Sequence, residues 1–546
     1  MELHAQTSAV APLMERFQAD EGALQRRYPH EFSARAQERM VDFYEAALME
    51  LSHQKFGSLP RDGQVDYLLF ENTLKHRIKI TELNAEKTKD VAPVVPFLSQ
   101  LLTLDEELRD FKPADGEAIA AQLTAIKKQV DGLPAKLKDA KISQRVAFAS
   151  LAAIDDAREA LRHWNRFYSG YEPIVTWWIA QPYKALDESL TRYRTFVSEN
   201  LAKIREGDNE AFPGEPVGKD RLMEDLASEL IDYTPEELIQ IGETEYAWCL
   251  KEMEKASAEL GYKDWHDALE HVKNLHVGPG EQPWMIRDLA LEAIDFMKKS
   301  DLLTVPPLAE ETWRMEMMSP EAQLRNPFFL GGETILVSYP TDTMSQDAKQ
   351  MSLRGNNRHF ARATVHHELI PGHHLQQFYQ SRHRTYRGGF GTPFWTEGWA
   401  LYWEMMLWDK GFAKTPENRI GMLFWRMHRC ARIVFSLKFH LGEMSPQECV
   451  EFLVKKVGHE RKNAEAEVRR SFAGDYPPLY QLAYMIGALQ IKQLRHELVD
   501  SGQMKEKAFH DAILMNNNMP IAIVRAALQK EAPAHPYEPG WKFYKL

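Results

Sequence analysis

Apolar positions along the first 320 or so residues follow the pattern of a helical protein. Apolar residues recur at intervals of three and four with charged residues between them, as on one face of an α-helix. The pattern is clearest in residues 43–51, 119–133, 151–168 and 285–302. Breaks fall at residues 92–96, 213–216 and 278–280. Each break is too short for an interdomain linker, and no repeat or low-complexity tract is present.

Residues 332–339 give the clearest strand signal in the chain. They read Gly-Glu-Thr-Ile-Leu-Val-Ser-Tyr, are rich in β-branched residues, and are bounded by a Gly-Gly pair and by Pro340. Helical patterns return after this segment. The sequence therefore predicts a mainly α protein, a large helical bundle with a small β-sheet.

Length and composition restrict the classes of protein to which the chain can belong. With 546 residues and 44% hydrophobic content, the chain is long enough for two subdomains around a cleft. A net charge of −12 argues against nucleic acid as a partner, and no apolar run of 18 residues predicts a membrane span. The sequence indicates no oligomeric state.

The N-terminal residues and the cysteines indicate in which cellular compartment the protein is expected. Residues 1–6 lack the basic and apolar regions of a signal peptide, so the chain as it stands is expected in the cytoplasm, or in the periplasm or outside the cell if a leader has been removed. The three cysteines fall in helical patterns and imply no disulfide framework.

Two short segments contain most of the candidate metal-ligating and acid–base residues. Residues 366–374 read His-His-Glu-Leu-Ile-Pro-Gly-His-His, and residues 395–400 read Trp-Thr-Glu-Gly-Trp-Ala. A hydrolytic zinc site needs three nitrogen or oxygen ligands and a carboxylate that is free to act as a base. We therefore predict one Zn²⁺ per chain, with His367, His373 and Glu397 as ligands and Glu368 as the general base.

The spacing departs from the usual His-Glu-x-x-His motif, in which the ligands lie one helical turn apart. His373 follows His367 by six residues and His374 follows it by seven, and neither could share an ion with His367 on a straight helix. Pro371 and Gly372 favour a bulge or kink that would bring His373 to the position of an ordinary second ligand. His374 stays open as the alternative ligand. The unused histidine of the pair and His366 would then support a ligand or pack.

Glu397 is expected in the first turn of an amphipathic helix, because a loop rich in glycine at residues 387–393 precedes it. Glu404 lies seven residues later on the same face. It is therefore a candidate partner for a ligand histidine, with an ion pair to a nearby arginine as the alternative.

Two stripes follow downstream. Arg432, Ser436 and His440 share one face of an otherwise apolar helix. Tyr476, Tyr480 and Tyr484 repeat the same spacing around a Pro-Pro pair, which fits a helix that starts at the prolines. Packing in the core is the ordinary role of such residues. Arg432 is also a candidate for binding a substrate carboxylate or bracing a ligand.

At these residues the sequence resembles the DUF885 family of bacterial proteins, which is grouped with the gluzincin zinc metallopeptidases. The resemblance covers at least residues 365–495, in the family's order and spacing. The matching residues are His367-Glu368, Pro371 to Gln376, Glu397 to Tyr402, Glu404, Arg429, Arg432 to Val434, His440, Pro478, Tyr484, Gly487 and Ile491.

The resemblance implies a mostly helical fold with a small sheet beside the active-site helices. It also implies that a strand such as 332–339 pairs along its edge with the substrate backbone, a purely structural hairpin strand being the alternative. A peptidase needs a donor aimed at the developing oxyanion. Tyr484 and His440 match the family pattern and are the candidates for that role.

We therefore expect a zinc-dependent peptidase that hydrolyses short or unfolded peptides. Residues 1–325 would form a helical wall of the cleft, and residues 326–546 the zinc-binding catalytic region. One alternative is a zinc amide hydrolase that acts on a small non-peptide molecule. A second is a helical binding scaffold with a degenerate metal site, which the retention of Glu368 and of every ligand disfavours.

Overall fold

The structure, a computed structural model, describes residues 8–204, 214–323, 326, 328–472, 476–538 and 540–546. It confirms a mainly helical protein. The chain divides into two compact units: unit 1 is Met1–Met14, Lys55–Asn72 and Pro216–Leu546, and unit 2 is Glu15–Gln54 and Thr73–Glu215. These two compact units do not coincide with the division at residue 325 that the sequence leads us to expect. That division, into a helical wall and a catalytic region, stays a prediction.

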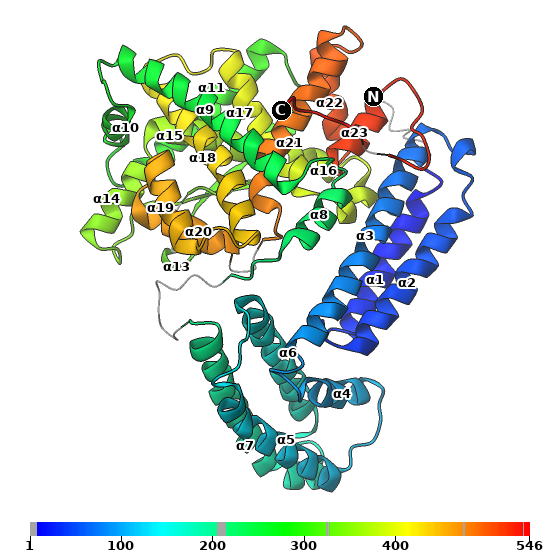
Figure 1. The fold of residues 1–546 in the computed structure, drawn as a ribbon. Helices are drawn as coiled ribbons and strands as arrows, with labels where there is room; N and C mark the ends of the chain where they lie inside the picture. The colour runs from blue at the N-terminus through cyan, green and yellow to red at the C-terminus, as the bar shows by residue number, and fades with distance from the viewer. Residues whose placement is uncertain (1–7, 205–213, 324–325, 327, 473–475, 539) are drawn as a thin grey trace. The chain divides into compact units, whose positions relative to one another are not determined.

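Unit 2 is built from long helices that pack in pairs, α4 with α6 and α5 with α7 (Figure 1). The helical segments predicted at 43–51, 119–133 and 151–168 lie within α2, α5 and α6, and the break at 92–96 separates α3 from α4. Its elements are α1 (Ala11–Arg27) and α3 (Arg61–Val91), both shared with unit 1, α2 (Ala34–Ser52), α4 (Leu98–Arg109), α5 (Gly116–Leu137), α6 (Gln144–Tyr168), α7 (Pro173–Phe196) and the π-helical η2 (Val197–Leu201).

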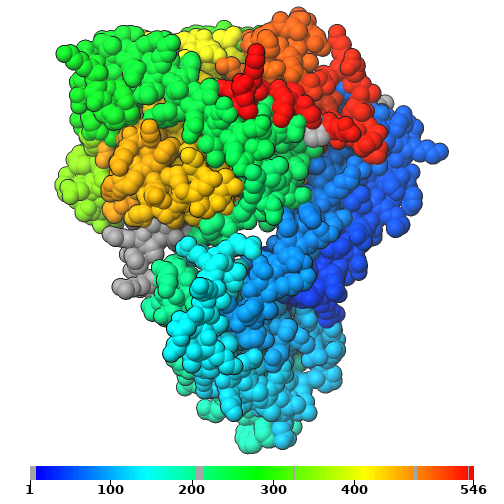
Figure 2. Space-filling model, in the orientation of Figure 1, coloured from blue at the N-terminus to red at the C-terminus, as the bar shows by residue number. Residues whose placement is uncertain are grey.

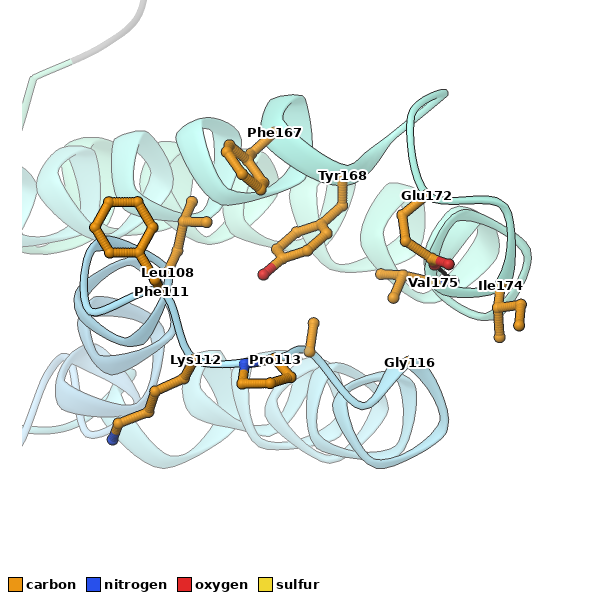
Figure 3. A pocket seen from close by; sticks show the side chains of 11 residues that line it. Leu108, Phe111, Lys112, Pro113, Gly116, Phe167, Tyr168, Glu172, Ile174 and Val175 are labelled. Carbon is orange, nitrogen blue, oxygen red and sulfur yellow. Dashed lines mark hydrogen bonds between the residues drawn. The ribbon is translucent and has the colours of Figure 1, made fainter.

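A surface cavity of about 470 Å³ lies in unit 2, between the connection from α4 to α5 and the facing ends of α6 and α7 (Figure 3). Apolar side chains such as Phe111, Tyr168 and Ile174 form most of its lining. Lys112 and Glu172 are the charged residues in the lining. The cavity therefore lacks the combination of ligands and acid–base groups that hydrolysis needs.

Unit 1 holds the remaining elements, and the segment predicted as a helix at 285–302 is α11. Its helices before the sheet are η1 (Phe56–Ser58), α8 (Lys219–Ser228), α9 (Pro235–Glu259), α10 (Trp265–Lys273), α11 (Gln282–Ser300) and α12 (Pro307–Thr312). After β1 follow α13 (Pro320–Gln323), α14 (Gln346–Gly355), α15 (Arg358–Glu368), α16 (His373–Gln380), η3 (Thr385–Phe390), α17 (Pro393–Asp409) and α18 (Pro416–His440). The chain ends with α19 (Pro446–Val457), α20 (Arg461–Phe472), α21 (Tyr480–Arg495), η4 (His496–Asp500), α22 (Glu506–Met515) and α23 (Ile521–Leu528).

The small sheet consists of two parallel strands, β1 (Arg314–Met317) and β2 (Thr334–Val337), in a register that pairs their first residues and their last residues. β2 is the core of the strand predicted at 332–339. Ile335 and Val337 point into an apolar cluster that also contains Val365 of α15. The sheet therefore lies beside α15, the helix that ends in the His-Glu pair.

Helices α17 and α21 approach very closely in unit 1 because glycines face each other. A Cβ atom at Gly398 would lie 2.6 Å from the Cα atom of Gly487. α17 is buried on almost its whole circumference, so the expectation of an amphipathic helix is wrong: helices cover it on several sides.

The starts of these helices also differ from expectation. α17 begins at Pro393 with Thr392 as its N-cap, so Glu397 lies in the second turn rather than the first. Part of the loop predicted at 387–393 is the 3-10 helix η3. α21 begins at Tyr480, after the two prolines, and Tyr476 precedes the helix.

The last residues of the chain lie on the surface of unit 1 (Figure 2). The Tyr544 hydroxyl donates to Glu245 of α9 at 3.0 Å, and the Tyr233 hydroxyl donates to the Tyr544 carbonyl at 2.8 Å. The three cysteines are buried and form no disulfide. Within the described ranges, every helix is too short or too polar to span a membrane.

Unit 2 contains a buried histidine held by two carboxylates. His30 is 5% exposed, and its ring nitrogens lie 2.8 Å from Asp105 and 2.7 Å from Asp156. Burial alone would lower the pKa of His30, but the hydrogen bonds to both carboxylates raise it to about 9. The protonated ring therefore stabilises the fold most fully below its ordinary pKa of 6.5.

We predict that His30→Gln lowers stability by on the order of 2 kcal/mol at pH 6 and by much less at pH 10, because the raised pKa of His30 means that its contribution is lost as pH rises through about 9. Thermal unfolding of both proteins between pH 6 and pH 10 measures the difference. An equal difference at both pH values would contradict the charged role of His30.

Candidate metal centre

Helix α15, which carries His367, ends where its sequence requires it to end. Asn357 caps α15 by accepting hydrogen bonds from the backbone, and the helix stops at Glu368. Pro371 has no N–H to continue the ladder. A Cβ atom on Gly372 would lie 1.7 Å from the carbonyl oxygen of His367, so only glycine fits this position. The kink predicted at Pro371-Gly372 is a full break, after which α16 starts at His373.

This break brings together three side chains from three helices. Nitrogens of His367 and His373 and an oxygen of Glu397 all lie within 4.8 Å of one another. Nε2 of His367 is 3.5 Å, and Nε2 of His373 is 3.2 Å, from Oε2 of Glu397. All three residues are buried. His367, His373 and Glu397 can therefore surround a single ion.

The electrostatics of the group suit a cation. Oε2 of Glu397 is buried and has no hydrogen-bond partner within the described part of the chain. Burial alone would lower the pKa of His373, but the Glu397 carboxylate raises it to about 9. The pocket thus favours positive charge beside Glu397. Two imidazoles and one carboxylate form the donor set that zinc takes in catalytic sites with an open position.

Neighbouring groups fix the orientation of both rings. Nδ1 of His367 donates to Oε1 of Glu404 at 2.7 Å, and Nδ1 of His373 donates to Oε1 of Gln376 at 3.1 Å. Gln376 is held in turn by the carbonyl of Trp395, at 3.1 Å from its Nε2. With the proton on Nδ1, each ring directs the lone pair of Nε2 at the ion position.

Glu404 stays ionised in this setting. Burial would raise its pKa, but the hydrogen bond to His367 and the charge of Arg429 lower it below the usual value. An ionised Glu404 makes the His367 ring a stronger ligand. The structure thus places Glu404 in contact with both His367 and Arg429, the two partners considered from its sequence position.

Glu368 is the last residue of α15 and directly follows a residue of the ion group. Its side chain is partly buried, and burial raises the pKa of its carboxyl group above the usual value. The chain before β2 lies directly against it: a Cβ atom on Gly331 would be 2.1 Å from Oε2 of Glu368 and 2.7 Å from its Cα. Gly331 therefore restricts the positions that this carboxylate can take.

Two tyrosines from the first turns of α21 face the same group. The Tyr480 hydroxyl donates a hydrogen bond to Oε1 of Glu397. The Tyr484 ring stacks on the His367 ring with 6.0 Å between their centroids. The sequence places Tyr480 in the same stripe as Tyr484, but only Tyr484 is a predicted catalytic residue. The spacing of four residues on one helix signals that both side chains face the same way.

The remaining predicted residues lie at different distances from the ion group. Nε2 of His374 donates to the carbonyl of Ala309 at 2.7 Å, so this ring is engaged elsewhere. His366 is buried beside Phe412, and neither ring nitrogen has a hydrogen-bond partner among the residues described. Arg432 stacks its guanidinium on Tyr484, with Cζ 4.4 Å from the ring centroid.

His440 lies two turns beyond Arg432 along α18, about 12 Å further along the helix axis. Its ring packs against Phe439 and Phe472, and burial lowers its pKa to about 4. The ring is therefore neutral near pH 7. A direct role at the reacting bond stays a prediction for His440.

Two solved structures share this fold. One, described as a "putative lipoprotein of unknown function" from Shewanella oneidensis, has a TM-score of 0.66 at 17% identity and covers 95% of this chain and 99% of its own. The other, described as a "putative lipoprotein" from Colwellia psychrerythraea, has a TM-score of 0.57 at 15% identity and covers 95% of this chain and 97% of its own. At these identities the likeness establishes the fold alone.

No curated protein matches the sequence. The model of the family described as "Bacterial protein of unknown function (DUF885)" matches residues 16–528, nearly the whole chain. The protein therefore belongs to the DUF885 family.

Proposed function

We propose that this protein is a zinc metallopeptidase. One observation carries the proposal: His367, His373 and Glu397 converge on one buried point, and the Glu368 carboxylate follows directly after His367 without belonging to the group. Three ligands with a separate carboxylate are what zinc hydrolysis requires. A purely structural zinc site would have four protein ligands.

Zinc, when bound, supplies a Lewis acid that lowers the pKa of a coordinated water to about 7. Glu368 would accept a proton from the attacking water and pass it to the amine that leaves. Burial raises the pKa of Glu368, which suits a group that must hold the proton between these two transfers. Tyr484 is the proposed donor to the developing oxyanion.

Tyr480 has a different part from Tyr484 in this proposal. Its hydroxyl proton is committed to Oε1 of Glu397, so Tyr480 orients the carboxylate ligand. Burial and the Glu397 charge raise the pKa of Tyr480 far above its usual value. The group therefore remains a hydrogen-bond donor at every pH at which the protein works.

Short or unfolded peptides are the proposed substrates, with the strand beside α15 as the surface along which they bind. Leu330 already exchanges both backbone hydrogen bonds with Leu336 of β2, at 3.1 and 2.8 Å, and β1 occupies the other side of β2. A substrate backbone must therefore pair with residues of this segment other than Leu336.

We predict about one zinc per chain, removed by chelation and restored with activity on re-addition. His373→Ala abolishes zinc binding, whereas its neighbour His374→Ala keeps the metal because His374 is bonded to the Ala309 carbonyl. Elemental analysis of both variants measures this. Zinc that survives the double change His367→Ala and Glu397→Ala would contradict the ligand assignment.

Glu368→Gln is expected to keep the metal and to lose two to three orders of magnitude in kcat, because only the proton transfer is removed. Zinc content and peptide turnover are measured on the same preparation. A variant with a rate near that of the wild type would show that another group activates the water.

Gly331→Ala tests whether the position of Glu368 matters. The added methyl group collides with Glu368, so we expect kcat to fall at least tenfold while zinc stays bound. Gly388→Ala is the matched control, because a Cβ atom there meets nothing within 4 Å. Equal activity in the two variants would mean that the contact with Gly331 does not position the base.

A further inference from the structure

Three buried arginines lie next to the ion group. They come from α18 and α20, and each is at least nine-tenths buried: Arg429 is 5% exposed, Arg432 2% and Arg470 9%. Arg429 and Arg432 place Cζ 4.5 and 4.4 Å from the centroid of the Tyr484 ring. Arg470 donates to the Tyr476 hydroxyl at 2.7 Å. We call these three residues the arginine cluster.

Each arginine keeps a donor that is not paired with any of the described residues. Nε of Arg429, Nη1 of Arg432 and Nε of Arg470 are buried and have no hydrogen-bond partner within the described ranges. Buried guanidinium donors are almost always paired, because an unpaired polar group in the interior costs about 1–3 kcal/mol or more when charged. Other buried arginines also keep an unpartnered donor, but these three lie beside the ion group, where a bound substrate can supply acceptors.

Two carboxylates serve the three arginines of the cluster. Arg432 and Arg470 share Glu467, at 2.7 and 3.9 Å. Arg429 reaches Glu404 at 3.8 Å, but Glu404 also accepts the proton of His367. Burial acts to lower the pKa of Arg432 and Arg470, but the shared Glu467 carboxylate raises both.

The cluster is close enough to the ion group to act on the same substrate. A single ring, Tyr484, contacts both the His367 ring and the guanidinium groups of Arg429 and Arg432. One side chain therefore separates the arginine cluster from the ion group, which suits a group near the bond that is cut.

We propose that the arginine cluster binds the C-terminal carboxylate of a peptide, so that the enzyme removes one residue at a time from the C-terminus. This inference rests on the proposed peptidase function. Water adds across the last peptide bond: its oxygen joins the carbonyl carbon, the C–N bond breaks, and a proton passes through Glu368 to the released amine. The products are a shortened peptide and a free amino acid.

A terminal carboxylate fits better than an acidic side chain. The α-carboxylate lies at a fixed, short distance from the last peptide bond in every peptide, whereas the reach of an Asp or Glu side chain varies with its rotamer. Guanidinium groups bind a planar carboxylate through two parallel hydrogen bonds. The free donors of the cluster lie on several arginines and match such a flat, multiply accepting group.

The test uses four peptides that differ only at the C-terminus. The last residue is Leu or Asp, and each occurs once as the free acid and once as the C-terminal amide. With the zinc-loaded protein we expect both free acids to lose their last residue, and both amides to react at least a hundredfold more slowly. Equal rates for acid and amide, internal cleavage, or a preference for Asp amide over Leu amide would overturn the proposal.

Failure of the wider peptidase proposal gives a separate result, because none of the four peptides would then be cut. Arg432→Gln adds a second measurement: KM for the Leu acid should rise at least tenfold with a smaller change in kcat, and the rate on the amide should fall by a much smaller factor than kcat/KM for the acid. Arg419→Gln is the control on the same helix, since Arg419 pairs with Glu259 away from the cluster. An equal effect on acid and amide would contradict carboxylate binding by Arg432.

Binding can also be measured without turnover. In Glu368→Gln loaded with zinc, calorimetry should show the Leu acid binding at least tenfold more tightly than the Leu amide. Arg432→Lys in that background keeps the charge but loses the paired geometry, and should retain part of the preference. Equal binding of acid and amide to folded Glu368→Gln would overturn the proposal whatever the effect of the arginine variants on stability.

Discussion

The close approach of Gly372 to the carbonyl of His367 is the constraint on which the candidate metal centre depends. A side chain at residue 372 has no room, and Pro371 prevents the helix from continuing. The chain therefore reverses within a few residues and starts a second helix at His373. A spacing of six residues, which a straight helix would spread over separate faces, thus becomes a pair of rings that face one carboxylate.

The helices around this break form a tightly packed platform. Gly398 and Gly487 let α17 and α21 approach until their backbones touch, which sets Glu397 opposite Tyr480. Many charged groups are buried here, and each needs a partner because desolvation costs several kcal/mol per ion. Most pairs are satisfied within the protein. Among the buried atoms without a partner in the described part of the chain, Oε2 of Glu397 and the donors of the arginine cluster are the positions where we expect the protein to meet a metal and a substrate.

The sequence predicts the helical class, a strand within 332–339 and the grouping of His367, His373 and Glu397, because periodicity and short-range spacing carry these features. It could not place His374, whose orientation depends on how far the helix rotates through the break and on a carbonyl 65 residues away. The contact of Tyr480 with Glu397 could not be predicted for a related reason. Helix α21 begins at Tyr480, and only the packing of α17 on α21 shows that the two side chains meet. The arginine cluster joins α18 to α20, and local patterns do not show that Arg432 and Arg470 compete for Glu467.

The most direct test of the account is the location of zinc in a crystal of the protein, from anomalous diffraction measured on both sides of the zinc absorption edge. The account predicts one strong peak, with Nε2 of His367, Nε2 of His373 and a carboxylate oxygen of Glu397 at about 2.0–2.2 Å, and Glu368 outside the coordination sphere. A peak coordinated by His374 or Glu368 in place of these ligands, or no peak at this point in crystals that contain zinc, would contradict it.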